Sequence, residues 1–185
     1  MINFTSLGGR TLLCACGTLS LIVFPEGKGK TDAGKGKDAM TLLSSPEETP
    51  TDGIISWPGE YHEKGVAIRG IGHIEGQQVS YIIQMEGSRI AFFSSPLQKL
   101  TDHELELVGD VDILVLPTEQ PAIVQNLIDE TDPRLLILVP GEGKDAKARD
   151  EVLRLCGAAG KEAVTEFKTK GALSAEGRDV VVMGK

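Results

Sequence analysis

The chain has 185 residues, enough for one domain with its own hydrophobic core and few for two, so we expect a single domain over residues 1–185. Its formal net charge of −8 gives an acidic surface that repels phosphate backbones, which argues against a nucleic-acid partner. The three cysteines form no CxxC pair and no paired framework. This sparse use of cysteine is typical of reduced thiols and predicts a cytoplasmic protein.

The amino-terminal half has the pattern of antiparallel β structure. The apolar stretch at 11–24 is too short to span a bilayer, and Gly17-Thr18 divides it, so we expect a two-strand hairpin and no membrane segment. A loop rich in Gly and Lys follows at 25–38, and a loop with two prolines lies at 44–50. Apolar runs predict the strands of this half at 10–16, 18–24, 40–43, 54–57, 65–71, 79–85 and 89–93.

The carboxy-terminal half alternates between helical and strand patterns. Thr101 followed by Glu104 is a capping-box pattern that opens a short helix ending at Gly109. Pro121 suits the first turn of a second helix, and a third is expected at 144–156. Strands are predicted at 111–116, 135–139, 165–168 and 179–183. Because the first two of these strands are apolar throughout, they need cover on both faces, which predicts an α/β sandwich with two sheets inside and helices outside.

One ordered set of motifs resembles a known family. The run Trp-Pro-Gly-Glu-Tyr at 57–61, then Gly-Val at 65–66 and Ile-Arg-Gly-Ile at 68–71, is similar to the compact branch of the metallo-β-lactamase fold superfamily. The hairpin at 82–90, the helix after Leu100 and the strand ending at Pro140 follow in the matching order. The resemblance implies an αββα four-layer sandwich, in which one or two metal ions at the sheet edges activate a water for hydrolysis.

The positions that carry metal ligands in that family hold other residues here. The resemblance places Ser45, Glu47, Thr49 and Pro50 where the family has its His-x-His-x-Asp-His loop. It likewise places Ser94-Ser95 at a Gly-Asp position, and Glu142 at the position of a terminal His. Hydroxyl groups are weak metal ligands and proline has no side-chain donor. We therefore expect no metal or other cofactor, and a vacated polar pocket lined by Ser45, Glu47, Ser95 and Glu142.

Two hypotheses of function follow. In the first, the protein is a catalytically degenerate member of the fold, kept as a binding or assembly module that meets a protein partner or forms a homo-oligomer. In the alternative, it is a metal-dependent hydrolase with a site rebuilt around Glu47, His73 and Glu142. There His73 would act as a general base, and the carboxylates would hold a cation such as Mg²⁺ or Ca²⁺.

Overall fold

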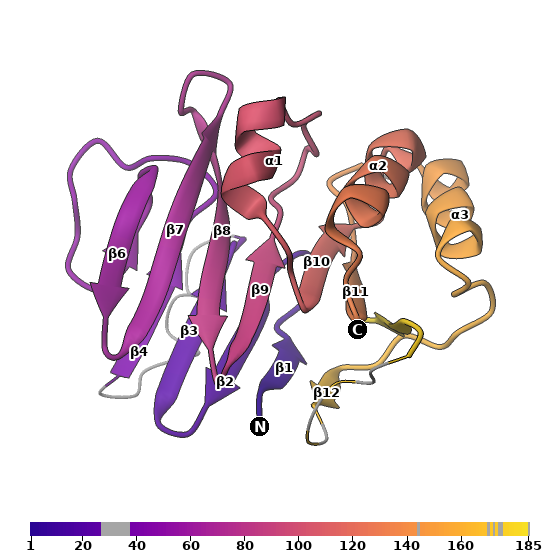
Figure 1. Cartoon of the computed structure of the whole chain (residues 1–185), viewed down its shortest axis with the longest axis horizontal. Coiled ribbons are helices and arrows are strands. Elements are labelled where there is room, and N and C mark those ends of the chain that lie inside the picture. The colour runs from indigo at the N-terminus through magenta and orange to yellow at the C-terminus, as the bar shows by residue number, and fades with distance from the viewer. Residues whose placement is uncertain (27–37, 144, 170, 172, 174–175, 185) are drawn as a thin grey trace.

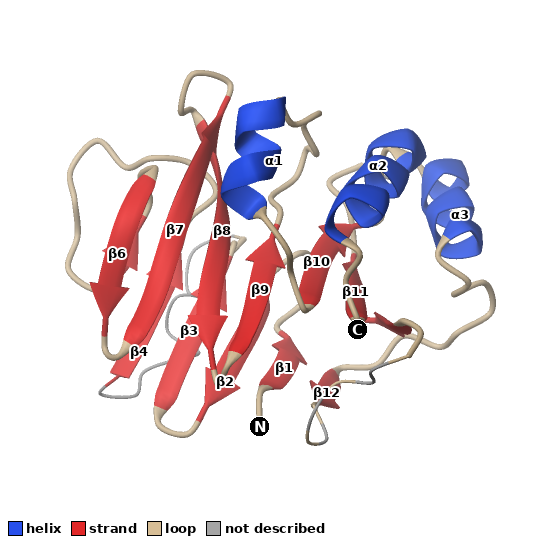
Figure 2. Ribbon diagram, viewed as in Figure 1, coloured by secondary structure: helices blue, strands red, loops and turns tan. Residues whose placement is uncertain are grey.

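The computed structural model describes residues 1–26, 38–143, 145–169, 171, 173 and 176–184. The chain forms two β-sheets that pack face to face (Figures 1 and 2). The strands of the first sheet are β1 (Asn3–Ser6), β2 (Leu12–Cys16), β3 (Leu19–Val23), β4 (Asp38–Leu42), β5 (Ile54–Ile55) and β12 (Glu166–Lys168). This six-stranded sheet has the order β12-β1-β2-β3-β4-β5.

The second sheet carries the parallel strands that position the candidate site. Its strands are β6 (Gly59–Glu63), β7 (Val66–His73), β8 (Gln78–Met85), β9 (Ser88–Phe92), β10 (Ile113–Pro117), β11 (Leu135–Val139) and β13 (Asp179–Val182). The order of this seven-stranded sheet is β13-β11-β10-β9-β8-β7-β6. Its first four strands in that order run parallel, whereas the other pairs are antiparallel. The carboxyl ends of β9, β10 and β11 therefore meet at one edge.

All three described helices pack on the outer face of the seven-stranded sheet. They are α1 (Asp102–Val108), α2 (Pro121–Thr131) and α3 (Ala146–Leu155). Figure 1 shows α1 in front of the sheet and α2 and α3 beside its β10 and β11 end. No helix within the described ranges covers the outer face of the six-stranded sheet. Nor is any described helix long and apolar enough to cross a membrane.

Alternation along β10 and β11 explains why these two strands are apolar throughout. Ile113 and Val115 of β10 face the core between the sheets, while Leu114 and Leu116 face the helices. All five residues of β10 and all five of β11 are buried. Burying both faces of a strand favours a continuous apolar run, as the sequence predicted.

The expected α/β sandwich of the metallo-β-lactamase type is confirmed, and most elements lie where the sequence placed them. The described helices form one outer layer, whereas the αββα expectation had helices outside both sheets. The capping box is present, with Thr101 and Glu104 each accepting from the other's backbone N–H. Strands β1 and β6 were not predicted. Most of the loop expected at 25–38 lies outside the described residues, as does Lys144, where the third helix was expected to begin.

Candidate functional site

The candidate site lies at the edge where three parallel strands end. Each strand is followed within three residues by a polar side chain: Ser95 after β9, Glu119 after β10 and Glu142 after β11. Parallel strands bring their carboxyl ends to one edge of a sheet, and ligand sites of open α/β sheets commonly lie there. The sheet topology thus gathers three side chains that are far apart in the sequence.

Glu119 is the acceptor that joins the three loops. Its Oε2 accepts from the Ser95 hydroxyl at 2.6 Å and from the Glu142 backbone N–H at 3.1 Å, while its Oε1 accepts from the Leu97 N–H at 2.6 Å. The Glu142 N–H also points at Ser95 Oγ, at 3.2 Å. Gly141 permits this approach, because a Cβ there would lie 2.9 Å from Glu119 Oε2. The carboxylate is held by hydrogen bonds inside the protein.

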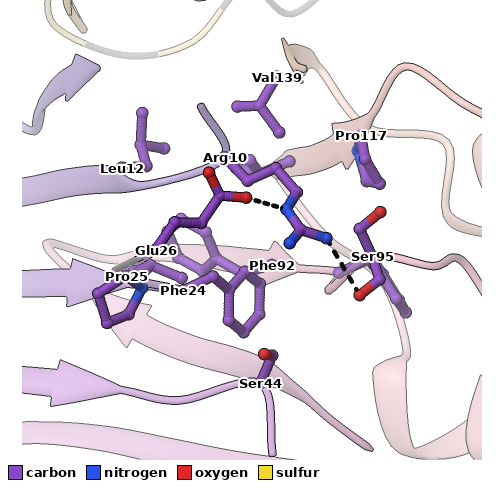
Figure 3. Close-up of a pocket in the computed structure, with 13 residues that line it drawn as sticks. Arg10, Leu12, Phe24, Pro25, Glu26, Ser44, Phe92, Ser95, Pro117 and Val139 are labelled. Carbon is purple, nitrogen blue, oxygen red and sulfur yellow. Dashed lines mark hydrogen bonds and ion pairs between the residues drawn. The ribbon is translucent and has the colours of Figure 1, made fainter. Parts of the chain in front are cut away.

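The six-stranded sheet contributes Arg10 before β2 and Glu26 after β3. The Arg10 Nε donates to Glu26 Oε1, and its Nη1 lies 3.4 Å from the Ser95 carbonyl oxygen and 3.5 Å from Glu142 Oε2. Figure 3 shows the guanidinium between Glu26 and Ser95. The Arg10 side chain is 21% exposed, whereas that of Glu142 is 58% exposed. A cation from one sheet therefore bridges to the loops of the other.

We call Arg10, Glu26, Ser95, Glu119 and Glu142 the edge cluster. A cavity of about 40 Å³ lies beside it, between the two sheets. Arg10, Glu26, Ser44 and Ser95 give the cavity its polar wall, and its apolar wall includes Leu12, Phe24, Phe92, Val115 and Val139 (Figure 3). A cavity of this size has room for one or a few water molecules. It does not hold a substrate of ordinary size in this conformation.

The structure brings together two of the four residues predicted to line the pocket, Ser95 and Glu142. Ser45 is exposed. The carboxylate of Glu47 accepts from the Thr51 hydroxyl at 3.4 Å, and its backbone N–H donates to Ser56. Among the described residues, the hydrogen bonds and ion pairs link Ser95 and Glu142 to the edge cluster, and they do not link Ser45 or Glu47 to it.

His73 lies on the other face of its sheet. Side chains alternate along β7, so His73 shares the face of Ile71, which packs in the helix-side core. Its Nδ1 donates to Glu104 Oε1 of α1 at 2.7 Å, and its Nε2 is buried without a protein partner. The described contacts join no two of Glu47, His73 and Glu142. Strand alternation turns His73 toward α1, so the described contacts do not link it to the other two residues of the expected rebuilt site.

The electrostatics of Glu104 follow from these contacts. Burial opposes ionisation of its carboxyl group, but hydrogen bonds from Thr101 and His73 outweigh that effect and hold its pKa below the usual range. The carboxylate accepts from both the N–H and the hydroxyl of Thr101. His73 and Glu104 thus form a pair that fastens α1 to the sheet.

The residues at the edge do not fit the metal ions that the family resemblance implies. Within the described part of the chain, no three or more His, Cys, Asp or Glu side chains gather in an arrangement that could hold a metal ion. At the edge itself, Ser95 donates to Glu119, and Glu142 faces the guanidinium of Arg10. Zinc sites are built from imidazole, thiolate and carboxylate groups, and a neighbouring cation disfavours them.

Sequence reasoning missed three members of the edge cluster: Arg10, Glu26 and Glu119. One signal could have found Glu119, because it follows an apolar parallel strand directly, as Glu142 does. No comparable local signal marks Arg10 or Glu26. Glu26 pairs with Arg10, and the other partners of Arg10, Ser95 and Glu142, come from distant parts of the chain.

No family model matches the sequence, and no curated protein matches it either. Solved structures do. A candidate zinc-dependent hydrolase of the metallo-β-lactamase superfamily from Thermotoga maritima superposes with a TM-score of 0.77 at 18% identity, covering 100% of this chain and 99% of that one. A candidate metal-dependent hydrolase from Parabacteroides distasonis gives a TM-score of 0.63 at 14% identity, covering 98% and 92%.

A third similar structure is the metallo-β-lactamase fold protein YhfI from Bacillus subtilis. Its TM-score is 0.60 at 12% identity, with 84% of this chain and 93% of that chain covered. At these identities the likeness concerns the arrangement of the backbone, and the overlap is nearly complete in the first two comparisons. The chain therefore has the fold of the metallo-β-lactamase superfamily.

Proposed function

We propose that this protein is a non-catalytic, metal-free member of its fold that serves as a binding or assembly module. The observation that carries the proposal is the place of Arg10, whose guanidinium lies among Glu26, the Ser95 carbonyl and Glu142 at the carboxyl edge of β9 to β11. The solved structures with a similar fold include proteins named as metal-dependent hydrolases. In this chain the guanidinium of Arg10 lies where the family resemblance implies a metal ion.

The charge balance of the edge cluster supports the proposal. Glu26 and Glu142 both face Arg10, and the hydrogen bonds of Glu119 are directed to Ser95, Leu97 and Glu142. A divalent cation entering the cluster would meet the repulsion of the guanidinium and would have to displace these hydrogen bonds. The side chains that could serve as ligands are thus already engaged.

The alternative function, a hydrolase with a rebuilt site, has one feature in its favour. The hydrogen bond from His73 to Glu104 is the kind of contact that orients a general base. The other nitrogen, Nε2, is however buried, and the whole residue is only 4% exposed. A base must reach its substrate, so this function requires α1 to move away from the sheet.

Metal content tests the proposal. The protein would be purified without chelator and without a polyhistidine tag, and its metals measured by elemental analysis. We expect the zinc, manganese and iron content to be well below one equivalent per chain. About one equivalent of a bound transition metal would refute the metal-free assignment.

A matched variant separates a rebuilt site from nonspecific cation binding. Glu142→Gln removes the carboxylate that the resemblance places at a metal-ligand position, while keeping the size of the side chain. We expect Zn²⁺ and Mn²⁺ to change the melting temperature of the wild type and of this variant equally. Stabilisation of the wild type that is absent from the variant, together with turnover of a chromogenic β-lactam or phosphodiester, would support the hydrolase instead.

A further inference from the structure

A groove on the outer face of the seven-stranded sheet lies apart from the edge cluster. Figure 1 shows no helix in front of β6 or the beginning of β7, whereas the end of β7 contacts α1 through His73. The groove lies over β6 to β9 at the carboxyl end of α1, and its volume is about 350 Å³. Its walls and floor include His62, Ala67, Arg69, Ile82, Gln84 and Arg89. This volume falls within the range of small-molecule sites.

The strand register places the polar residues of the groove in order. His62, Ala67, Gln84 and Arg89 are successive Cα partners across β6, β7, β8 and β9, so they form one row on one face. Arg69 is two residues after Ala67 on β7 and therefore stands on the same face, in the next row. Ala67 and Gln84 are both exposed. The small side chain of Ala67 thus forms the floor of the groove, with polar and cationic side chains around it.

The two arginines are neighbours because both cap α1. Arg89 donates from Nε and Nη2 to the Val108 carbonyl oxygen at 3.0 and 2.8 Å, and Arg69 Nη1 lies 3.5 Å from the Leu107 carbonyl oxygen. Burial, followed by repulsion from Arg69, lowers the pKa of the Arg89 guanidinium. The two positive charges are therefore close enough to act on each other.

Only one carboxylate pairs directly with the two guanidiniums in the described contacts. Glu60 accepts from Arg69, and its side chain is 74% exposed. The direct contacts of Arg89 are to helix carbonyls, with the charge of Asp110 nearby. The lining of the groove therefore holds two guanidiniums and one carboxylate, that of Glu60, while Asp110 near Arg89 lies outside the lining. Two guanidiniums held together by a helix end are preorganised for an oxyanion.

We propose that this groove binds the oxyanion group of a small organic ligand, a carboxylate or a phosphate. Arg69 binds the oxyanion directly, with His62 and Gln84 as further donors and Arg89 supplying the second positive charge. Ala67 leaves the space into which the ligand enters. The site is independent of the edge cluster, so it stands whether or not a metal is bound there.

Titration by nuclear magnetic resonance tests this site. Inorganic phosphate and benzoate, each added at constant ionic strength, would be followed through the Nε–Hε signals of the arginines and the backbone amides of Ala67 and Gln84. We expect saturable shifts at Arg69, Arg89 and Ala67, with an affinity in roughly the millimolar range. The probe that binds more tightly identifies the oxyanion. Absence of saturable shifts at Arg69 with both probes would overturn the proposal.

Three variants make the test specific. Arg69→Gln should weaken binding by roughly tenfold, because a charge-assisted hydrogen bond is lost. Ala67→Glu, at an exposed position, should abolish binding by placing a carboxylate on the floor. The control Arg154→Gln removes the same charge from the exposed side of α3 and should leave binding unchanged. Equal affinity in all three variants, with the fold intact by their amide spectra, would refute the site.

Discussion

The hydroxyl of Ser95 donates to the carboxylate of Glu119 at 2.6 Å, across the loops that end two parallel strands. The same carboxylate also accepts from the N–H groups of Leu97 and Glu142, so it links three loops. An acceptor shared by three loops helps to fix their mutual positions. The stability of this edge should therefore depend on side-chain hydrogen bonds that mutation can remove singly.

Replacing Glu119 should destabilise the protein more than replacing an exposed glutamate does. In Glu119→Ala, Ser95 Oγ and the N–H groups of Leu97 and Glu142 lose their acceptor, so we expect a loss of about 1–3 kcal/mol in the free energy of unfolding. Urea unfolding followed by circular dichroism measures it. Glu130→Ala, at an exposed position in α2, is the control and should change stability by less than about 0.5 kcal/mol. Equal effects would contradict the structural role of Glu119.

Removing the positive charge of Arg10 should make the edge cluster responsive to cations. In Arg10→Met the carboxylates of Glu26 and Glu142 lose their shared partner, and their repulsion should lower stability by about 1–3 kcal/mol. Oxygen donors left without a cation suit Ca²⁺, so millimolar Ca²⁺ should raise the melting temperature of the variant by roughly a few degrees.

Thermal unfolding with and without Ca²⁺ measures this difference. The wild type should show no such rise, because its guanidinium already pairs with both carboxylates. Arg154→Met is the matched control, since it removes an arginine from an exposed position in α3. A rise of equal size in the wild type would show that Arg10 does not stand in place of a cation.

The sequence pattern predicted the elements whose residues alone determine their conformation. The continuous apolar runs of β10 and β11 require burial on both faces, and Thr101 with Glu104 forms a local cap. Strand β6 escaped prediction because four of its five residues are exposed, so it has no apolar alternation. It is a strand because its backbone pairs with β7, and such pairing leaves little trace in composition.

The candidate site was harder to predict because distant residues build it. The family resemblance supplied the positions of Ser95 and Glu142, and a hydrogen bond joins them in the structure. The ion pairs of Arg10 depend on how the two sheets meet, which no local pattern records. The position of His73 was accessible in principle, since Ile71 two residues earlier marks the helix-facing side of β7. Resemblance to a family indicates which positions in the sequence carry site residues. The hydrogen-bond and ion-pair partners of those residues become known only from the folded structure.

The contribution of Glu104 to stability should depend on pH. Its pKa is lowered in the folded state from the model-compound value of 4.5, so the stabilisation is complete above that value and is lost as the pH falls through the folded-state pKa. Glu104→Gln should therefore differ from the wild type by about 1 kcal/mol near neutral pH. The difference should shrink steadily below pH 4.5.

Urea unfolding of both proteins across this pH range measures the difference. Glu106→Gln is the control on the same helix, because the side chain of Glu106 is 82% exposed. The difference between the wild type and this control variant should stay small at every pH. A gap for Glu104→Gln that grows toward acid would contradict the sign of the lowered pKa.

The effects of mutating Gly141 and Glu119 on stability should be coupled, because only the absence of a Cβ at Gly141 lets the Glu119 carboxylate lie this close to the backbone. A Cβ at this position would lie 2.9 Å from Glu119 Oε2 and 3.1 Å from Glu119 Cβ, so Gly141→Ala should push the carboxylate away from Ser95 and the Glu142 N–H. We expect a loss of about 1–2 kcal/mol in the wild-type background.

A double-mutant cycle isolates this coupling. With Glu119→Ala already present, the added methyl group meets no carboxylate and only the Cβ of residue 119 remains close, so Gly141→Ala should cost less than in the wild type. The sum of the two single losses in unfolding free energy should therefore exceed the loss of the double variant by about 1 kcal/mol. Gly143→Ala is the control for the backbone, since Gly143, like Gly141, is not among the glycines with positive φ and, among the described atoms, its Cβ would meet only Asp145 N, at 3.8 Å. If the stability loss of the double variant equals the sum of the two single losses, Gly141 and Glu119 are not coupled. The Glu119 carboxylate would then link the three loops without needing a glycine at position 141.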